Sequence, residues 1–474
     1  MSLTPPATRA SEIMRFFRSP AFKLFLIGGI IIVLLIPLVL VLALVDERQQ
    51  RSSSVVSEIA GSWGGTQSLA GPFLVVPYTV KVEATENGKL VISQQERRAV
   101  FLPDQLTIDG QAASKTLKRA IYEVTVYSAG VKLSGKFAPS DLATVGGNIT
   151  SVRWNEAVLA FTLTNVASLK NAATLSVGTE KIALEPSIGV TFVNNPGFQI
   201  PGVHAPLVKA IGLVRQATAG DSGAPHLTLP EFTFDLPLQF DGSSELSFAP
   251  VARETVIKLA SDWASPSFTG AFLPTERAIS AQGFTASWTI PSLARSVPQS
   301  YELGNSTFSE FQPYPATVRF YVPVDFYDLV GRAAKYAVLF VTAAFMAVFL
   351  LELLSKARVH PVQYLFVGIA MVFFYVLLLS LAEHIGFGFA YLTASLATGG
   401  LLALYVGKSL RSLPKGLMML AAFLILYGLL FLVLQLEDYA LLAGAIAGFV
   451  ILAGVMLLTL RVDWSGRAAP ETKT

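Results

Sequence analysis

Residues 24–45 read LFLIGGIIIVLLIPLVLVLALV, an apolar run without a single polar or charged side chain. About 20 apolar residues are needed to cross a bilayer as a helix, so this run predicts a membrane-spanning segment. No comparable run follows until Tyr336, after which apolar stretches recur almost to the end of the chain. The sequence therefore predicts one span, a long gap and five further spans.

The predicted spans define the domain organisation of the chain. They cover residues 24–45, 336–354, 361–381, 388–406, 416–436 and 439–460. The first run is longer than the apolar region of a signal peptide, and no small-x-small cleavage site follows it, so we expect an uncleaved anchor. The expected parts are a tail at 1–23, the anchor at 24–45, an exterior domain at 46–334, a five-helix transmembrane domain at 335–460 and a tail at 461–474.

The Lys and Arg residues near the predicted spans indicate the orientation, because short cytoplasmic loops are enriched in these residues. The two short loops around Glu383-His384 and Glu437-Asp438 contain none. We therefore expect both termini in the cytoplasm and 46–334 in the periplasm. The positive charges all fall on the opposite side, at Arg9, Arg15, Arg18, Lys23, Lys356, Arg358, Lys408, Arg411, Lys415, Arg461, Arg467 and Lys473.

The composition excludes several classes of function. Segment 46–334 carries 22 Lys and Arg against 25 Asp and Glu, so it lacks the basic surface that nucleic-acid binding requires. The chain has no cysteine, which excludes disulfides, thiol catalysis, Cys-ligated zinc and iron–sulfur clusters. Charged residues are only 14% of the chain, against about 25% in a typical soluble domain. This low fraction fits a chain that lies partly in a membrane.

The exterior segment changes its periodicity after a short helix. Residues 46–60 form a helical pattern, which Trp63-Gly64-Gly65 ends. Apolar residues then alternate with polar neighbours along 232–240, and Asp241-Gly242-Ser243-Ser244 leads into Leu246 and Phe248, which predicts a hairpin. Short alternating segments with frequent turns are typical of antiparallel sheets. We expect an α+β membrane protein, with a six-helix (1+5) transmembrane bundle and a large β-rich, antiparallel, sandwich-like periplasmic domain.

No motif indicates catalysis or a cofactor. The four histidines, His204, His226, His360 and His384, have no second His or carboxylate at the spacing of a metal site. No nucleophile elbow, phosphate-binding loop or dinucleotide fingerprint is present. We therefore predict no catalytic residue, no metal site and no cofactor, and expect the exterior domain to bind rather than to catalyse.

Ionisable residues at the ends of the predicted spans are the main candidates in the membrane part, because such residues are costly at membrane depth. Glu383-His384 and Glu437-Asp438-Tyr439 lie at the outer ends. The ordinary explanation is that water solvates them in interfacial loops, with Tyr439 as an aromatic anchor. Near the inner face, Glu352 and Lys356 have the spacing of a local ion pair.

Several motifs resemble the CreD family of bacterial inner-membrane proteins, which are also described as cell envelope integrity proteins. The likeness runs in order from about Lys23 to Trp464. It is carried by Glu47-Arg48-Gln49, Ser62-Trp63-Gly64-Gly65-Thr66-Gln67, Gly71-Pro72, Ser261-Asp262-Trp263, Pro266-Ser267-Phe268, Gly270-Ala271-Phe272-Leu273-Pro274, Gly283-Phe284 with Trp288, Lys335-Tyr336, His360-Pro361-Val362-Gln363-Tyr364, Leu379-Ser380-Leu381-Ala382-Glu383-His384 and Leu436-Glu437-Asp438-Tyr439-Ala440-Leu441-Leu442.

The resemblance implies an inner-membrane location, induction by a sensor kinase and response regulator, and a role in envelope stress that includes tolerance to colicins and β-lactams. It supplies no catalytic residues. Because its motifs gather where the chain enters or leaves the membrane, the candidate functional residues are Trp63, Gly64, Gly65, Gln67, His360, Gln363, Glu383, His384, Glu437, Asp438 and Tyr439.

Three hypotheses follow from these observations. The favoured one is a non-enzymatic envelope-integrity protein, whose partners are the lipid bilayer and an envelope component or membrane protein. The second is a transporter or lipid-handling protein that uses the five-helix bundle, with Glu383, His384, Glu437 and Asp438 at its outer mouth. The third is a periplasmic hydrolase or transferase that acts on the cell wall. The sequence indicates no oligomeric state.

Overall fold

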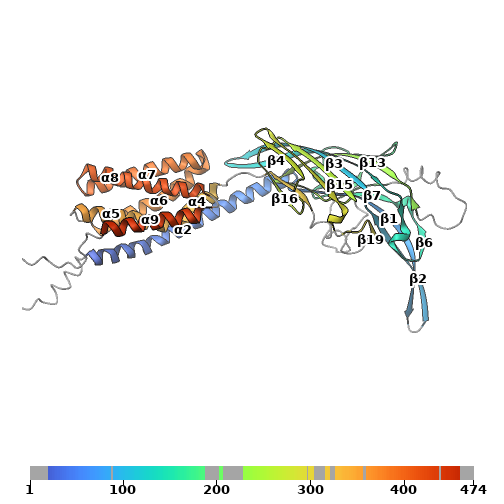
Figure 1. The fold of residues 1–474 in the computed structure, drawn as a ribbon, viewed down its shortest axis with the longest axis horizontal. Helices are drawn as coiled ribbons and strands as arrows, with labels where there is room; N and C mark the ends of the chain where they lie inside the picture. The colour runs from blue at the N-terminus through green and yellow to red at the C-terminus, as the bar shows by residue number, and fades with distance from the viewer. Residues whose placement is uncertain are drawn as a thin grey trace, which may run out of the picture. The chain divides into compact units, whose positions relative to one another are not determined.

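The computed structural model describes residues 20–86, 89–186, 202–206, 228–295, 297–303, 315–320, 326–355, 359–436 and 439–459. The chain forms two compact units, a sheet-rich unit at Ser54–Pro323 and a helical unit that joins Met1–Ser53 to Val324–Thr474. Both units appear as ribbons in Figure 1. The domain limits expected from the sequence stay predictions.

The helical unit is built from apolar helices. Among the residues that the structure describes, four helices, α2, α6, α7 and α8, are long and apolar enough to cross a membrane. Helices α4 and α5 are bent by 50° at their junction and make a fifth span if they are counted as one. The helices are α2 Pro20–Ser62, α4 Phe326–Lys335, α5 Ala337–Ser355, α6 Pro361–Ile385, α7 Phe387–Ser409, α8 Leu413–Gln435 and α9 Ala440–Thr459.

The predicted spans agree with these helices to within a few residues in the second part of the chain. The sixth predicted span, 439–460, coincides with α9. The apolar segment of this helix, Leu442–Gly454, is shorter than the four helices named above. The number of six spans therefore stays a prediction. Helix α2 continues beyond the predicted span to Ser62, so the expected anchor and the short helix at 46–60 are one element.

The sheet-rich unit contains two large sheets. In the described residues the first sheet has ten strands, in the order β10-β11-β7-β1-β14-β20-β16, with β2 and β6 beside β1 and β19 beside β2. Its strands are β1 Gln67–Glu86, β2 Lys89–Phe101, β6 Ile149–Val152, β7 Val158–Leu163, β10 Glu185–Pro186, β11 Gly202–Pro206, β14 Glu245–Phe248, β16 Pro266–Gly270, β19 Ser300–Glu302 and β20 Ala316–Phe320.

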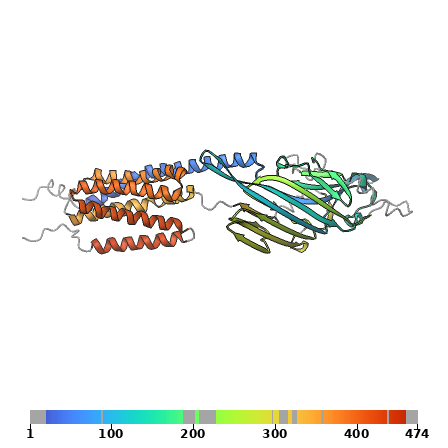
Figure 2. The same cartoon turned by 90° about the horizontal axis from the view of Figure 1, so that it is seen from above.

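As far as the described ranges show, the second sheet has eight strands in the order β17-β18-β15-β3-β4-β13-β8-β9. Figure 2 shows β3 and β4 in cyan to green beside the olive strands β15 and β18. The strands are β3 Gln105–Arg119, β4 Tyr122–Phe137, β8 Thr174–Val177, β9 Glu180–Ala183, β13 Phe232–Ser243, β15 Glu254–Ser261, β17 Glu276–Ser280 and β18 Gly283–Pro291. A separate pair joins β5 Ser140–Asp141 to β12 Thr228–Leu229, and short 3-10 turns lie at Leu142–Val145, Trp154–Glu156, Val166–Ser168 and Ser292–Ala294.

Within the described part of the chain, one hydrophobic cluster contains buried side chains of both sheets. Phe73 and Tyr78 of the first sheet share it with Leu133, Phe240 and Trp288 of the second. Alternate residues of β13 are buried, as the period-two pattern predicts. Most strand pairs are antiparallel, as expected, but β1 pairs with β14 and β3 with β15 in parallel.

The predicted hairpin at 232–248 is wrong. β13 pairs with β4 and β8, whereas β14 pairs with β1 and β20, so the two strands lie in different sheets. Gly242 is part of β13, where a Cβ atom would overlap the Tyr127 ring of the neighbouring strand. The glycine therefore permits close approach rather than a turn. Ser244, with φ of 62°, redirects the chain from one sheet to the other.

Candidate functional site

The end of α2 is joined to the sheets by the residues that the sequence singled out. The helix ends at Ser62, and Gly64 and Gly65 then adopt φ of 105° and 68°, which favour glycine. A Cβ atom on Gly64 would lie 2.5 Å from the Asp241 carbonyl oxygen. The backbone here approaches β13 more closely than any other residue would allow.

Gln67 lies buried behind this turn, at the start of β1. Its Nε2 donates to the carbonyl oxygens of Gly64 and Asp241, both at 3.0 Å, and to Ser168 Oγ at 2.8 Å. Its Oε1 accepts from the backbone N–H of Asn165 at 3.2 Å. Both ends of the amide are engaged with the protein, so Gln67 fixes the helix end to two distant loops.

A charged pair covers the same junction. Lys170 Nζ lies 2.6 Å from Asp241 Oδ2 and 5.3 Å from the centre of the Trp63 ring. Ser128 Oγ donates to Asp241 Oδ1 at 2.7 Å. The Asp241 carboxylate is buried and satisfied by these two donors. The structure thus brings Trp63, Gly64 and Gln67 together, in an arrangement that holds the fold.

The helical unit contains a second polar cluster, around Glu352 near the end of α5. Its Oε1 forms an ion pair with Lys23 and accepts from the N–H of Val359 at 3.1 Å, and its Oε2 accepts from the Tyr364 hydroxyl at 2.8 Å. Lys23 Nζ also donates to the Val359 carbonyl oxygen at 2.6 Å and lies 5.4 Å from the Tyr364 ring centre. One cation and two neutral hydrogen-bond donors therefore compensate a buried carboxylate.

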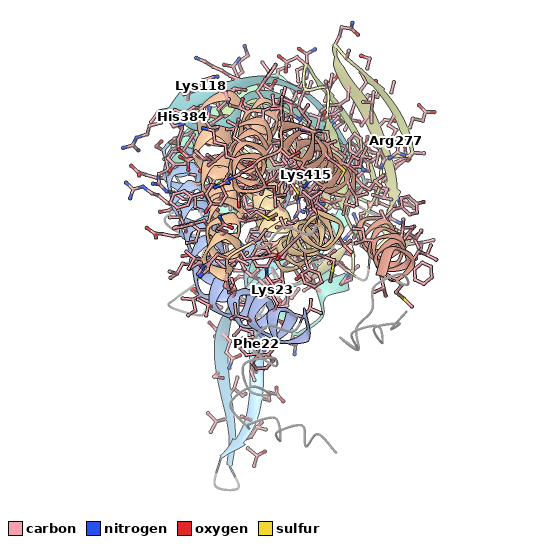
Figure 3. All side chains as sticks on the ribbon, turned by 90° about the vertical axis from the view of Figure 1, so that its left-hand side faces the viewer. Phe22, Lys23, Lys118, Arg277, His384 and Lys415 are labelled. Atoms are coloured by element: carbon pink, nitrogen blue, oxygen red, sulfur yellow. The ribbon has the colours of Figure 1, made fainter. Side chains whose placement is uncertain are left out.

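Sequence reasoning missed Lys23 as the partner of Glu352. Lys356, the partner expected at helical spacing, lies outside the described residues. Lys23 is more than 300 residues away in the chain and lies in the first turn of α2 (Figure 3). Local spacing cannot reveal such a pair. The only signal available was an acidic residue inside an otherwise apolar span.

His360 and Gln363 form the capping box of α6. His360 Nδ1 accepts from the N–H of Val362 at 3.3 Å, and Gln363 Oε1 accepts from the N–H of His360 at 3.0 Å. Gln363 Oε1 also accepts from Ser409 Oγ, at 3.0 Å, which links the start of α6 to the end of α7. These contacts satisfy N–H groups that the first turn of a helix otherwise leaves unpaired.

Among the remaining candidates, Glu383 and His384 lie in the last turn of α6, and Tyr439 lies just before α9. Glu383 is half-buried and accepts from the Tyr327 hydroxyl at 3.1 Å. His384 is exposed, with Nδ1 3.0 Å from the Ser380 carbonyl oxygen. Tyr439 is exposed. Glu437 and Asp438 lie outside the described residues, so the proposed outer mouth with its four ionisable groups is described only in part.

A feature that the sequence analysis did not identify is the distal part of the β1–β2 ribbon. The two strands pair without interruption from Leu74 opposite Phe101 to Glu86 opposite Lys89. Figure 1 shows β2 extending beyond the rest of its sheet. In the described residues, β6 flanks β1 only up to Val80 and β19 flanks β2 only at 99–101. We call residues 81–86 and 89–95 the arm.

The arm exposes three consecutive apolar side chains. Leu90, Val91 and Ile92 are 65%, 41% and 52% exposed. Side chains alternate along a strand, so Leu90 and Ile92 lie on one face and Val91 lies on the other. Beyond Lys81, whose N–H donates to the Asn148 carbonyl oxygen at 2.9 Å, both edges of this ribbon carry backbone groups that no described strand pairs. A run of three apolar residues within a polar stretch is the sequence signal that could have identified it.

No described group of three or more His, Asp or Glu residues is close enough to hold a metal ion. The charged residues discussed above are instead engaged with lysine, tyrosine, serine or backbone partners.

Comparison with known proteins identifies the family. Residues 19–465 match the model of the family described as "Inner membrane protein CreD". The chain is 32% identical to Inner membrane protein CreD of Escherichia coli (strain K12), over 458 residues that cover 96% of each chain. This match includes both the apolar helices and the two sheets. The chain belongs to the CreD family of inner membrane proteins.

Proposed function

We propose that this inner-membrane protein supports the integrity of the cell envelope by presenting its sheet domain in the periplasm, where the arm binds a protein partner. The activity is binding and is not enzymatic. The observation that carries the proposal is the arm, whose paired strands leave the sheet with exposed apolar side chains and with edges that no described strand pairs.

The orientation rests on the positive charges of the helical unit. The contact between Lys23 and Glu352 joins the start of α2 to the end of α5, and that between Gln363 and Ser409 joins the start of α6 to the end of α7. Lys23 and Lys408 therefore share one end of the unit. Since cytoplasmic loops are rich in such residues, we assign this end to the cytoplasm and the sheet domain to the periplasm.

The chemistry of the arm favours a protein over a glycan as the partner. Open strand edges offer N–H and C=O groups to another strand, and alternating side chains add specificity. The arm carries Lys81, Glu83, Glu86 and Lys89, so its charges balance. Because the arm has no net charge, it attracts a polyanionic wall polymer only weakly. Its apolar side chains and strand edges instead suit pairing with the edge of another sheet.

The sandwich architecture gives the arm a rigid base. We propose that the two sheets pack as a sandwich around their shared core, since both contribute fully buried aromatic side chains to it. The proximal part of β1 lies between β2 and β7 in the first sheet. The arm is thus anchored at its proximal end, while at its distal end no further strand of the described ranges flanks it.

Photo-crosslinking in living cells tests the proposal directly. A crosslinking amino acid at position 92 of the full chain is expected to capture one envelope protein reproducibly, as identified by mass spectrometry. Ile279, on edge strand β17, is the matched control, because its 51% exposure equals that of Ile92 within 1%. Equal yields of the same products at both positions, or capture of wall polymer or lipid alone, would contradict the proposal.

A pair of substitutions connects binding to the cellular role. Leu90→Thr with Ile92→Thr keeps residues that favour strands but removes the apolar surface. For this comparison the crosslinking amino acid is placed at position 91, which the variant leaves unchanged. We expect the variant to accumulate normally in the membrane while losing both the crosslink from the arm and the tolerance to colicins and β-lactams. Ile279→Thr is expected to retain both. Normal tolerance in the double variant would show that the arm is not the functional surface.

A further inference from the structure

A groove lies between α2 and the short helix α4 within the helical unit. Its volume is about 670 Å³, which is in the range of small-molecule binding sites. Its apolar wall comes from α2 and includes Val39, Leu42 and Val45. The remaining lining is polar and charged. A groove with one apolar wall and one charged wall suits an amphipathic ligand.

The groove lies where the apolar part of the helices ends. The apolar run of α2 stops at Val45 and Asp46 follows, while the apolar helix α5 begins at Ala337, just after Lys335. Residues on both sides of this limit line the groove. In a bilayer this level corresponds to the boundary between acyl chains and headgroups. The surrounding molecules at this depth are lipids.

Four charged residues line the polar half of the groove: Asp46, Asp328, Arg332 and Lys335. Asp328 Oδ1 accepts from Gln49 Nε2 at 3.0 Å, which links the two helices across the groove. Arg and Lys are the usual partners of phosphate groups. The two carboxylates offer acceptors for a protonated amine. The lining therefore has two charges of each sign and matches a zwitterion rather than a simple anion.

Gly331 keeps the groove open between these charges. A Cβ atom at this position would lie 3.7 Å from Val45 Cγ1, so an alanine fits but a larger side chain enters the groove. Tyr327, which also lines the groove, donates a hydrogen bond from its hydroxyl group to Glu383. Glu383 thus supports one wall of the groove and need not itself meet a ligand.

From this combination we infer that the groove binds one ethanolamine phospholipid. The phosphate pairs with Arg332 and Lys335, the primary ammonium group donates to Asp46 and Asp328, and the upper acyl chain lies along Val39 and Leu42. A quaternary choline headgroup has no N–H to donate, and a glycerol headgroup has no cation, so each loses one set of contacts. The site selects the headgroup by hydrogen bonding and not by charge alone.

Native mass spectrometry of the full chain tests this inference. The protein is reconstituted in nanodiscs of equimolar phosphatidylethanolamine, phosphatidylcholine and phosphatidylglycerol, then released, and the retained lipids are counted. We expect one phosphatidylethanolamine molecule to be retained, about tenfold over either competitor, because charge-assisted hydrogen bonds differ by roughly this factor. Preference for phosphatidylglycerol, or no preference among the three lipids, would overturn the inference.

Three variants separate the contacts. Arg332→Gln with Lys335→Gln is expected to lose retention of all three lipids, and Asp46→Asn with Asp328→Asn to keep a lipid but lose the discrimination against choline. Gly331→Leu fills the groove without changing charge and is expected to abolish retention. Arg48→Gln, on the exposed part of α2 outside the groove lining, is the matched control for nonspecific attraction and is expected to behave as wild type.

The inference does not depend on the arm. The orientation proposed above decides only that the lipid belongs to the outer leaflet. Loss of crosslinking from the arm with intact lipid retention would contradict the proposed function alone. Retention that is the same in wild type, in Gly331→Leu and in Arg332→Gln with Lys335→Gln would contradict the lipid site alone.

Discussion

The two polar clusters near the ends of α2 differ in how they tie the helix to distant parts of the chain. Near its N-terminus, Lys23 pairs with the carboxylate of Glu352 inside a unit of apolar helices. Just beyond its C-terminus, Gln67 makes only neutral hydrogen bonds to carbonyl, hydroxyl and amide groups. Removing one partner of the first cluster leaves a buried charge, whereas removing Gln67 leaves unpaired neutral groups. The two losses in the free energy of unfolding should therefore differ in size, and so should the second substitution that recovers them.

The largest effect is expected at the charged cluster. Lys23→Met should lower the free energy of unfolding by about 3–5 kcal/mol, because Glu352 then remains buried without its cation. The double variant Lys23→Met with Glu352→Met should recover part of this loss, since no charge is left unpaired. Unfolding in mixed micelles monitored by circular dichroism measures both values. A double variant that is less stable than Lys23→Met alone would contradict this account.

The neutral hydrogen bonds of Gln67 should be less costly to break. Gln67→Leu removes the donor for Gly64, Ser168 and Asp241, and should cost about 2–3 kcal/mol through unpaired buried groups. Pulse proteolysis of the full chain measures the loss in the sheet unit. Gln111→Leu, at an exposed position of β3, is the control and should change stability by less than about 0.5 kcal/mol. Similar losses of stability in both variants would contradict a specific role for the Gln67 hydrogen bonds.

Arg295 offers an intermediate case, a buried cation held by neutral oxygens of Val297, Ala252 and Gln299. Burial lowers its pKa to about 10. In Arg295→Lys the same burial should lower the lysine pKa below its ordinary value of about 10.4. Between this lowered folded pKa and the ordinary value, the unfolded chain binds more protons than the folded chain, so the stability of the variant rises with pH across that window.

At pH 7 this variant should be less stable than wild type by about 1–2 kcal/mol, because lysine cannot reproduce the fork of hydrogen bonds. The deficit should shrink between pH 7 and 9, where wild-type Arg295 stays charged. Thermal unfolding at several pH values measures the difference. A deficit that is constant or grows with pH would refute the role assigned to burial.

The smallest effect is expected at the helix cap. His360→Ala removes the acceptor for the Val362 N–H and should cost about 1 kcal/mol, as N-cap replacements do. His360→Asn should restore most of this loss, because asparagine is a good N-cap residue. The same mixed-micelle unfolding assay applies. If both variants lose several kcal/mol, His360 has a role beyond capping.

The length of the apolar runs predicted the helices, and the period-two alternation predicted strands. The spans after Tyr336 lie within a few residues of α5 to α9, and Trp63-Gly64-Gly65 does end a helix. Alternation along Phe232–Phe240 correctly indicated which side chains are buried. The partner strand was wrong, because alternation reports the face of a strand and not its neighbour.

The candidate site was predictable only where its contacts are local. The capping box of His360 and Gln363 could be read from spacing, and the glycines after Trp63 from their permissive backbone. The contacts of Glu352 with Lys23 and of Gln67 with Asp241 join residues far apart in the chain. No periodicity encodes such pairs. They arise only when the folded units bring the segments together.

The single residue between β13 and β14 has a consequence for how the sheet domain opens. Ser244 joins strands of different sheets, and the chain changes sheet again between β14 and β15 and between β15 and β16. One sheet cannot unfold while the other stays intact, because strands that follow one another from β13 to β16 belong alternately to the two sheets. Slowly exchanging amide protons in β13 and β14 should therefore share one opening free energy, as expected of a single cooperative unit. Partial unfolding is then confined to segments outside this interleaved core, above all to the arm.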